Sequence, residues 1–150
     1  MAETEDQVEE IRNLFLEYAN SLDFKLCFQD FDKELKELPG QYSMPSGRLI
    51  LAKEGKKMIG CAGLRMLEPE ICEMKRLYVK PEFRRRGIGR GLAELVIEEA
   101  KKIGYHRMRL DTVSTMHEAI ALYRSLGFKE ISPYRLNPLE GATYFELILI

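Results

Sequence analysis

The chain has 150 residues, 45% of them hydrophobic and 31% charged, and its 23 basic and 24 acidic side chains give a formal net charge of -1. This length suits one domain with one core, because domains commonly run to ~100–150 residues. The balanced charge gives no whole-protein field for nucleic acid or an anionic membrane, and no stretch approaches the ~18 apolar residues of a membrane span. We expect a single domain over residues 1–150 that binds neither.

The cysteines and histidines do not form a metal-binding pattern. Cys27, Cys61 and Cys72 lie beside apolar residues without C-x-x-C spacing, which favours reduced, buried thiols over disulfides or metal ligands. His106 and His117 stand alone in polar stretches, which favours surface or capping positions. The sequence predicts no metal site. The acidic N-terminal segment is unlike a secretion signal, so we expect a cytoplasmic location.

The N-terminal part of the chain predicts two helices. Apolar residues at helical spacing indicate a helix over residues 5–20, and Thr4 with Gln7 has the spacing of a capping box at its start. A second, short helix is expected from Asp30 to Leu38, where a Pro-Gly pair ends it. Residues 41–47 have the composition of a loop.

The rest of the chain alternates strand and helix signals. The predicted strands are Arg48–Lys53, Lys57–Leu67, Ile71–Val79, His106–Thr112, Gly127–Ile131 and Thr143–Ile150, and the predicted helices are Ile88–Ile103, capped by Gly104, and residues 115–126. Short turns make the first three strands antiparallel. A helix separates the third strand from the fourth, so that pair should be parallel with a right-handed crossover. The fold class is therefore α+β, with a central mixed, mostly antiparallel sheet flanked by helices.

The most informative stretch lies between the strand ending at Val79 and the helix starting at Ile88. Residues 84–91 read R-R-R-G-I-G-R-G. Glycines let a backbone approach a ligand closely, and the N–H groups of a helix's first turn can be directed at an anion. A P-loop is excluded because Gly-Lys-Ser/Thr is missing, and a dinucleotide fingerprint would need glycine where the chain has Leu92. A tight turn with a solvated basic face is the alternative. Three glycines that alternate with arginines at the start of a helix favour a phosphate-binding site, which we call the phosphate cradle.

The pattern R-x-x-G-x-G over residues 84–89 has further support on both sides. L-Y-V-K-P-E-F precedes it, and A-L-Y-R-S-L-G-F follows at residues 121–128. On these motifs the chain resembles the GNAT superfamily of acyl-CoA-dependent N-acetyltransferases over roughly residues 48–131. The resemblance implies the GNAT fold and acetyl-CoA as the cosubstrate. GNAT proteins usually begin with a strand before the first helix, and here that strand is expected to be short or missing.

The resemblance also implies how acetyl-CoA binds. The Arg84 side chain and the backbone of residues 85–91 would hold the pyrophosphate. The backbone of Leu77–Val79 would pair with the pantetheine arm like an added strand, which requires a splay between the central strand and the His106 strand. The implied cofactor-binding residues are Leu77, Tyr78, Val79, Arg84, Arg85, Arg86, Gly87, Ile88, Gly89, Arg90 and Gly91. Family members often carry Asn where this chain has Met116, and that Asn hydrogen-bonds the pantetheine arm. The contact with the pantetheine arm at this position is therefore expected to differ.

Tyr123 is the candidate general acid. Family members place a tyrosine near the cofactor sulfur, and a phenol with an unperturbed pKa of ~10 is protonated at neutral pH and can protonate the leaving thiolate. The alternative is a helix aromatic that packs beside Leu122 and Leu126, and both roles are compatible.

Glu73 is the candidate base. By resemblance it occupies the position of the glutamate of the histone-acetylating branch, on the strand beside the expected thioester. A partly buried carboxylate would have a raised pKa and could take a proton from an ammonium group. The alternative is a structural ion pair with Lys75 or Arg76.

In the resembled family the acceptor site lies under the two N-terminal helices, and the loop over residues 131–141 is expected to contribute to it. By resemblance, Phe28 and Gln29 are candidate substrate-binding residues, and a core role for the aromatic side chain is the alternative. Arg135 lies in the segment 131–141, and its forked cation suits a carboxylate on an amino-acid-like acceptor. The alternative is a solvated arginine or a pair with Glu140.

These observations predict an acetyl-CoA-dependent N-acetyltransferase that moves an acetyl group to a primary amine of a small molecule by direct attack in a ternary complex. One alternative is a protein or peptide N-acetyltransferase, which needs an open groove. Another is a non-catalytic acyl-CoA-binding regulatory module. Because the resembled family often dimerises, a homodimer is also expected.

Overall fold

The computed structural model describes residues 4–21, 31–135 and 141–149. Its elements in chain order are α1 (Glu5–Ser21), α2 (Phe31–Glu37), η2 (Gly40–Tyr42), β1 (Arg48–Glu54), β2 (Lys57–Glu68), β3 (Ile71–Val79), η3 (Pro81–Phe83), α3 (Ile88–Ile103), β4 (Arg107–Val113), α4 (His117–Ser125), β5 (Lys129–Ile131) and β6 (Ala142–Ile148). The strands form one six-stranded sheet in the order β1-β2-β3-β4-β6-β5. The expected mixed, mostly antiparallel sheet flanked by helices is confirmed.

The sheet opens at its centre. Strands β3 and β4 are parallel, as predicted, whereas the other neighbouring strands of the sheet run antiparallel. The register between β3 and β4 covers only Ile71–Glu73 against Arg107–Arg109. Beyond Glu73 the two strands separate, and β3 continues to Val79 paired with β2 alone. The predicted splay is therefore confirmed, and it leaves an edge of β3 open in the middle of the molecule.

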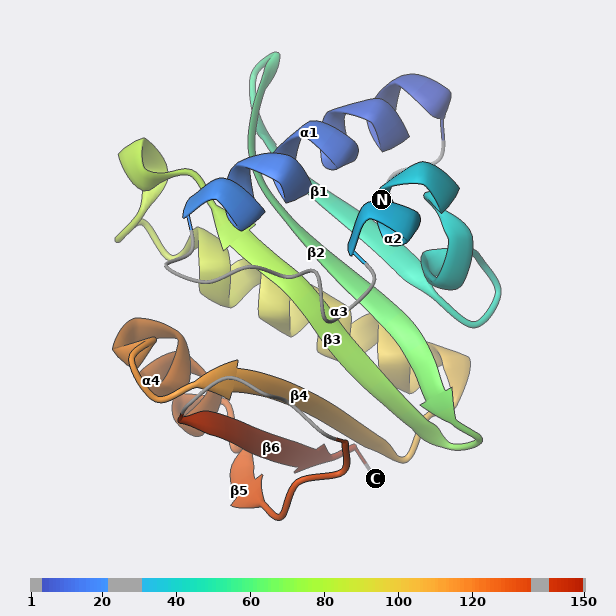
Figure 1. Cartoon of the computed structure of the whole chain (residues 1–150), viewed down its shortest axis with the longest axis vertical. Helices are drawn as coiled ribbons and strands as arrows, with labels where there is room; N and C mark the ends of the chain where they lie inside the picture. The colour runs from blue at the N-terminus through green and yellow to red at the C-terminus, as the bar shows by residue number, and fades with distance from the viewer. Residues whose placement is uncertain (1–3, 22–30, 136–140, 150) are drawn as a thin grey trace.

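Two layers of helices cover the sheet, as Figure 1 shows: α1 and α2 lie over one face, and α3 and α4 lie against the other. Each layer has its own core. Alternation along β3 sends Cys72 and Met74 into the core with α3. A break in the β2–β3 register, with a left-handed φ of 59° at Arg76, shifts the alternation, so Tyr78 joins the core with α1. Glu73 lies between Cys72 and Met74, so its side chain points to the opposite face of the sheet, the one that α1 covers.

Local sequence signals explain most element ends. The capping box at α1 is present, because Gln7 N–H donates to Thr4 Oγ1 and Thr4 N–H donates to Gln7 Oε1, both at 3.2 Å. Gly104 ends α3 with a left-handed φ of 108°, and its N–H bonds to the carbonyls of Ala100 and Lys101. Cys61 and Cys72 are buried free thiols, as expected, and Cys27 lies outside the described residues.

Several element boundaries differ from the sequence-based expectations by one or two residues, and two of the differences concern local conformation. Gly40–Tyr42 forms a 3-10 turn inside a stretch predicted as loop, and it buries Tyr42. Helix α4 begins at His117, two residues after the predicted position 115, because Met116 has a non-helical ψ of 68°. Among the described residues no strand precedes α1.

The described residues include no helix long and apolar enough to cross a bilayer.

Candidate functional site

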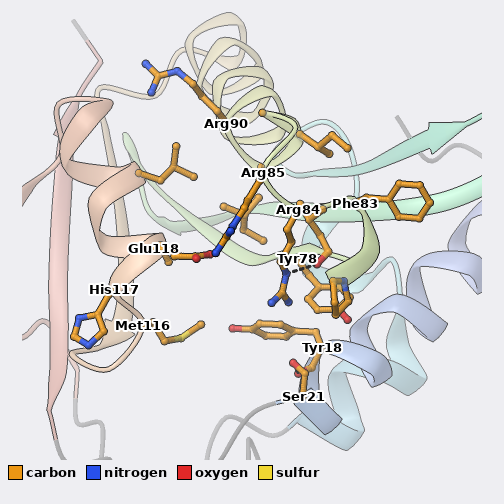
Figure 2. Close-up of a pocket in the computed structure, with 18 of the residues that line it drawn as sticks. Tyr18, Ser21, Tyr78, Phe83, Arg84, Arg85, Arg90, Met116, His117 and Glu118 are labelled. Atoms are coloured by element: carbon orange, nitrogen blue, oxygen red, sulfur yellow. Dashed lines mark hydrogen bonds between the residues drawn. The ribbon is translucent and has the colours of Figure 1, made fainter.

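A cavity of about 840 Å³ lies where β3, α3 and α4 meet. Its volume is within the ~300–1,000 Å³ of small-molecule sites. Figure 2 shows its walls: the loop after β3 and the start of α3 on one side, the start of α4 opposite, and the end of α1 below. The lining residues are Tyr18, Ser21, Leu77, Tyr78, Val79, Pro81, Phe83, Arg84, Arg85, Gly87, Ile88, Gly89, Arg90, Thr115, Met116, His117, Glu118, Ala119 and Leu122.

One end of the cavity suits a phosphate group. Gly87 caps α3 with a left-handed φ of 77°, a conformation that favours glycine, so the chain can turn sharply and direct the first N–H groups of the helix at the cavity. Ile88, Gly89 and Arg90 are the first residues of α3 and line the wall. Gly91 contributes no donor, since its N–H bonds to the Gly87 carbonyl at 3.0 Å, and it does not line the cavity.

The loop arginines divide into two groups. Arg84 and Arg85 line the cavity, and Arg84 Nε donates to the Val79 carbonyl at 3.0 Å. Arg86 turns away from the cavity, because it pairs with Glu54 at 3.2 Å and lies over the Phe83 ring. The structure thus brings together nine of the eleven residues expected to bind the cofactor and leaves Arg86 and Gly91 outside the cavity.

The open edge of β3 forms the long wall of the cavity. Leu77, Tyr78 and Val79 line it where β4 has separated from β3, so a ligand can lie along this edge as an added strand would. Met116 forms part of the opposite wall, and its thioether accepts a hydrogen bond from Thr112 Oγ1 at 3.4 Å. An apolar sulfur therefore stands where the resembled family places an amide.

Tyr123 lies behind this wall and outside the set of lining residues. Its side chain is 8% exposed, with its ring 5.8 Å from that of Phe128 and 6.4 Å from that of Phe145. Burial raises the pKa of the Tyr123 phenol, and the nearby Tyr18 and Asp111 raise it further. Tyr123 therefore packs as an aromatic core residue and keeps its proton, which both interpretations of the sequence require. Its role as the acid stays a prediction.

The expected raised pKa of Glu73 is wrong. Its side chain is 0% exposed, and burial alone would raise the pKa, but the nearby Lys75, Arg65 and Arg135 and a hydrogen bond from Tyr134 hold it below its usual value. Arg65 pairs with one carboxylate oxygen at 2.7 Å, and the Tyr134 hydroxyl donates to the other at 2.6 Å. A carboxylate with these donors binds a proton weakly. This geometry disfavours Glu73 as the base, which stays an untested hypothesis.

Arg135 pairs with Glu73 rather than lying solvated in its loop. Its guanidinium also lies 4.9 Å from the centre of the Tyr134 ring. The alternative partner Glu140, like the candidate substrate residues Phe28 and Gln29, lies outside the described residues. Recognition of an acceptor carboxylate by Arg135 would therefore have to compete with Glu73, and it stays a prediction.

The sequence-based interpretation missed two parts of the site. Tyr18 and Ser21, at the end of α1, close the cavity from below, and His117 with Glu118 forms its rim on α4. Tyr18 had been visible only as one apolar position of an amphipathic helix. No local pattern indicates that its hydroxyl end faces a cavity built from residues 60 to 100 positions away.

The amino-acid sequence is similar to those of known proteins. The family model "Acetyltransferase (GNAT) family" matches residues 8–128. The chain belongs to the GNAT acetyltransferase family. An uncharacterized N-acetyltransferase of Schizosaccharomyces pombe is 37% identical over 142 residues, covering 93% of this chain and 87% of its own. The [ribosomal protein bS18]-alanine N-acetyltransferase of Escherichia coli is 44% identical, but over 54 residues, which are 36% of each chain.

Solved structures agree with the GNAT assignment. A GNAT family acetyltransferase from Staphylococcus aureus has the same fold, with a TM-score of 0.82, 21% identity and coverage of 100% of this chain and 98% of its own. A GNAT family acetyltransferase from Elizabethkingia anophelis, solved with acetyl-CoA bound, has a TM-score of 0.61 and 28% identity over 75% of this chain and 82% of its own. The chain is therefore an acyltransferase of the N-acetyltransferase class.

Proposed function

We propose that this GNAT acetyltransferase uses acetyl-CoA to acetylate a primary amine of a small molecule, by direct attack within a ternary complex. The observation that carries the cosubstrate is the cavity itself, which joins a helix N-terminus with two arginines to an open strand edge. An acyl-CoA has a pyrophosphate for the first part and an amide-containing arm for the second. Bound there, acetyl-CoA supplies an activated acetyl group as a thioester.

The residues of the chain would mainly position the two reactants. The N-terminus of α3, with Arg84 and Arg85, fixes the phosphate end, and the edge of Leu77–Val79 directs the arm toward the splay. Holding the amine and the thioester in attack geometry supplies much of the rate. Tyr123 is proposed to protonate the leaving sulfur, a contribution worth roughly 10²–10⁴-fold.

The small-molecule acceptor is proposed for the side of the sheet next to Glu73. There Tyr134 and Arg135 are tied to the sheet through the Glu73 carboxylate. A peptide acceptor needs a groove open along its length. The sequence similarity to the bS18-alanine enzyme covers 36% of the chain, so it does not by itself favour a protein acceptor.

The test is an acceptor panel with acetyl-CoA, read by thiol release and by the mass of the product. It should contain small aliphatic amines, amino acids, and peptides with free N-termini or lysines. We expect a small amine to give the highest kcat/KM, with an acetylated product. Turnover of peptides alone would replace this proposal with the peptide acetyltransferase. Acetyl-CoA binding without any acetylated product would favour a non-catalytic acyl-CoA-binding module.

A further inference from the structure

Two arginines share the buried carboxylate of Glu73. Arg65 of β2 donates to Oε1 of Glu73 from Nη2 at 2.7 Å and from Nε at 2.8 Å, and Arg135 donates to Oε2 from Nη2. The Glu73 side chain is 0% exposed, whereas the side chains of Arg65 and Arg135 are 17% and 22% exposed. A ligand on this face can therefore reach the two guanidinium groups but not the carboxylate that they share. We call Arg65 and Arg135 the arginine pair.

The shared carboxylate leaves one positive charge of the arginine pair without a carboxylate of its own among the residues that the structure describes. The neighbouring cations on this face of the sheet pair with other carboxylates: Arg76 with Glu34 at 2.9 Å, and Arg109 with Glu146 at 2.8 Å and with Glu68 at 3.5 Å. Lys75, whose charge also acts on Glu73, lies within the electrostatic reach of Asp111. The excess positive charge at the arginine pair favours an anionic ligand.

Arg135 also has hydrogen-bond donors to spare. A guanidinium carries more N–H donors than one carboxylate can accept. Arg65 donates from all three of its nitrogens, because its Nη1 bonds to Gln41 Oε1. Nε and Nη1 of Arg135, by contrast, donate to no group in the described part of the chain. Competition between Glu73 and a ligand for Arg135 is limited, since Arg65 keeps the Glu73 carboxylate paired.

Two tyrosines hold Arg135 in place. Its guanidinium lies 4.9 Å from the centre of the Tyr134 ring, and the Tyr134 hydroxyl is itself fixed by donating to Glu73 at 2.6 Å. The Tyr144 hydroxyl on β6 donates to the Arg135 carbonyl at 2.9 Å. The two rings pack edge-on with their centres 5.2 Å apart. Because this side chain is already ordered, little conformational entropy is lost when it binds a ligand.

The arginine pair lies at the base of the splay. Glu73 is the cross-strand partner of Arg65 on β2 and of Arg109 on β4, and it is the last β3 residue that pairs with β4. An acyl-CoA arm that follows Val79 and then Leu77 runs toward this point. An acceptor whose amine meets the thioester there can place a second group on the arginine pair.

We propose that Arg135, with Arg65 beside it, binds a carboxylate of the acceptor, so that the acceptor is an amino acid with a free acid group. The planar fork of a guanidinium matches the two oxygens of a carboxylate and gives charge-assisted hydrogen bonds. This substrate class rests on the proposed function, because it concerns the second reactant of the same site.

The test compares Arg135→Gln with the wild-type protein on L-amino acids and on the matching amino-acid amides, which keep the amine and the side chain but lack the carboxylate. We expect Arg135→Gln to lower kcat/KM for the acid about 10- to 100-fold, mainly through KM, and to change that for the amide less than about 3-fold. Arg107→Gln is the matched control. It removes an exposed guanidinium on the same face that pairs with Glu146 at 3.6 Å, and it should change neither value.

Both acceptors are measured on the same variant, so a loss of folded protein lowers both rates equally and does not imitate the expected ratio. Calorimetry gives a second readout that does not depend on turnover. N-acetyl amino acids, the expected products, and their amides are titrated into protein saturated with coenzyme A. Wild type should bind the acid about 10-fold more tightly than the amide, and Arg135→Gln should bind the two alike. Arg135→Lys, which keeps the charge but not the fork, should restore part of the difference.

Equal effects of Arg135→Gln on acid and amide, or none, would overturn the inference. Acetylation by wild type of amines without a carboxylate alone would overturn it as well and leave the proposed function standing. If neither acceptor is acetylated while wild type still binds the N-acetyl acid more tightly than its amide, the result counts against the proposed function and supports the carboxylate site. Equal binding of the two without any product would overturn both.

Discussion

Glu73 is fully buried and held by three groups from two parts of the chain: Arg65 on β2, and Tyr134 and Arg135 after β5. These contacts tie the segment after β5 to the centre of the sheet. The carboxylate is thus positioned to order the segment after β5. Removing one partner of such a buried set leaves the others uncompensated.

Glu73→Gln should lower the free energy of unfolding by about 3 kcal/mol at pH 7, because two arginines lose their common carboxylate. The folded-state pKa of Glu73 lies below its usual 4.5, so its stabilisation is present above that pH and is lost as the pH falls through the folded value. Urea denaturation at pH 7 and below pH 4 should show the difference from wild type shrinking at acid pH. A constant difference would show that charge is not the cause.

The same Glu73→Gln variant tests the base hypothesis. If the carboxylate were the base, the variant would lose activity most at the acidic end of the working range. We expect the shape of the pH-rate profile to be kept, because a carboxylate with a lowered pKa does not titrate in that range. Loss of the acid limb alone would restore Glu73 as the proton acceptor.

Lys75 gives a stability prediction of opposite sign. Burial lowers its folded-state pKa to about 7 from 10.5, so between these values the unfolded chain binds more protons than the folded one, and stability rises with pH. Lys75→Met removes this term. Relative to the variant, wild-type unfolding free energy should gain about 1 kcal/mol per pH unit between pH 7.5 and 9.5. If the unfolding free energies of wild type and Lys75→Met changed with pH in the same way, the burial of a titrating lysine would be contradicted.

Tyr123→Phe keeps the ring contacts with Phe128 and Phe145 and removes only the hydroxyl, so its thermal stability should stay close to that of wild type. If Tyr123 is the acid, kcat should fall ~10²-fold or more while acetyl-CoA affinity is nearly kept. Steady-state kinetics together with calorimetry separates the two quantities. A variant with wild-type turnover would leave Tyr123 as a packing residue.

At the scale of elements, local signals predicted most of the fold. The helix Ile88–Ile103 and the strand Ile71–Val79 were expected with the bounds that the structure shows, because the apolar pattern lies within each segment and Gly104 and Pro81 stand just past their ends. The cradle was predictable for the same reason: its glycines and arginines are consecutive. Arg86 and Gly91 lie outside the cavity. The sequence could not exclude them from the binding site, because it does not show which way each residue of a turn points.

Partners distant in the chain could not be predicted. Arg135 pairs with Glu73, 62 positions earlier, and Tyr144 stands beside Asp111 through the register of β4 and β6. Sequence reasoning assigned both arginine and glutamate to separate roles, since each was considered with its neighbours in the chain. The pKa of Glu73 was predicted in the wrong direction because burial was foreseen and the surrounding cations were not.

At the scale of the whole molecule, one sheet separates two helical layers and opens at its centre, so the cofactor edge and the acceptor face meet at a single splay. In the proposed complex the phosphates of acetyl-CoA lie at the start of α3. Membership in the GNAT family and the acyltransferase class follow from this architecture and the family match. The homodimer stays a prediction.

The central claim is that acetyl-CoA binds at the start of α3, and calorimetric titration of Gly89→Asp tests it most directly. A Cβ at Gly89 would meet only Val79 Cγ2 at 3.7 Å and Leu122 Cδ2 at 4.0 Å, which are ordinary contacts, so the fold should accept the side chain. Gly55→Asp, which adds the same charge in the turn between β1 and β2, is the control; Gly55 has a left-handed φ of 63°, a conformation that Asp adopts more readily than most residues. We predict micromolar-range binding by wild type and control and none by Gly89→Asp, because its carboxylate occupies the phosphate position. Unchanged affinity in a folded Gly89→Asp protein would contradict the account.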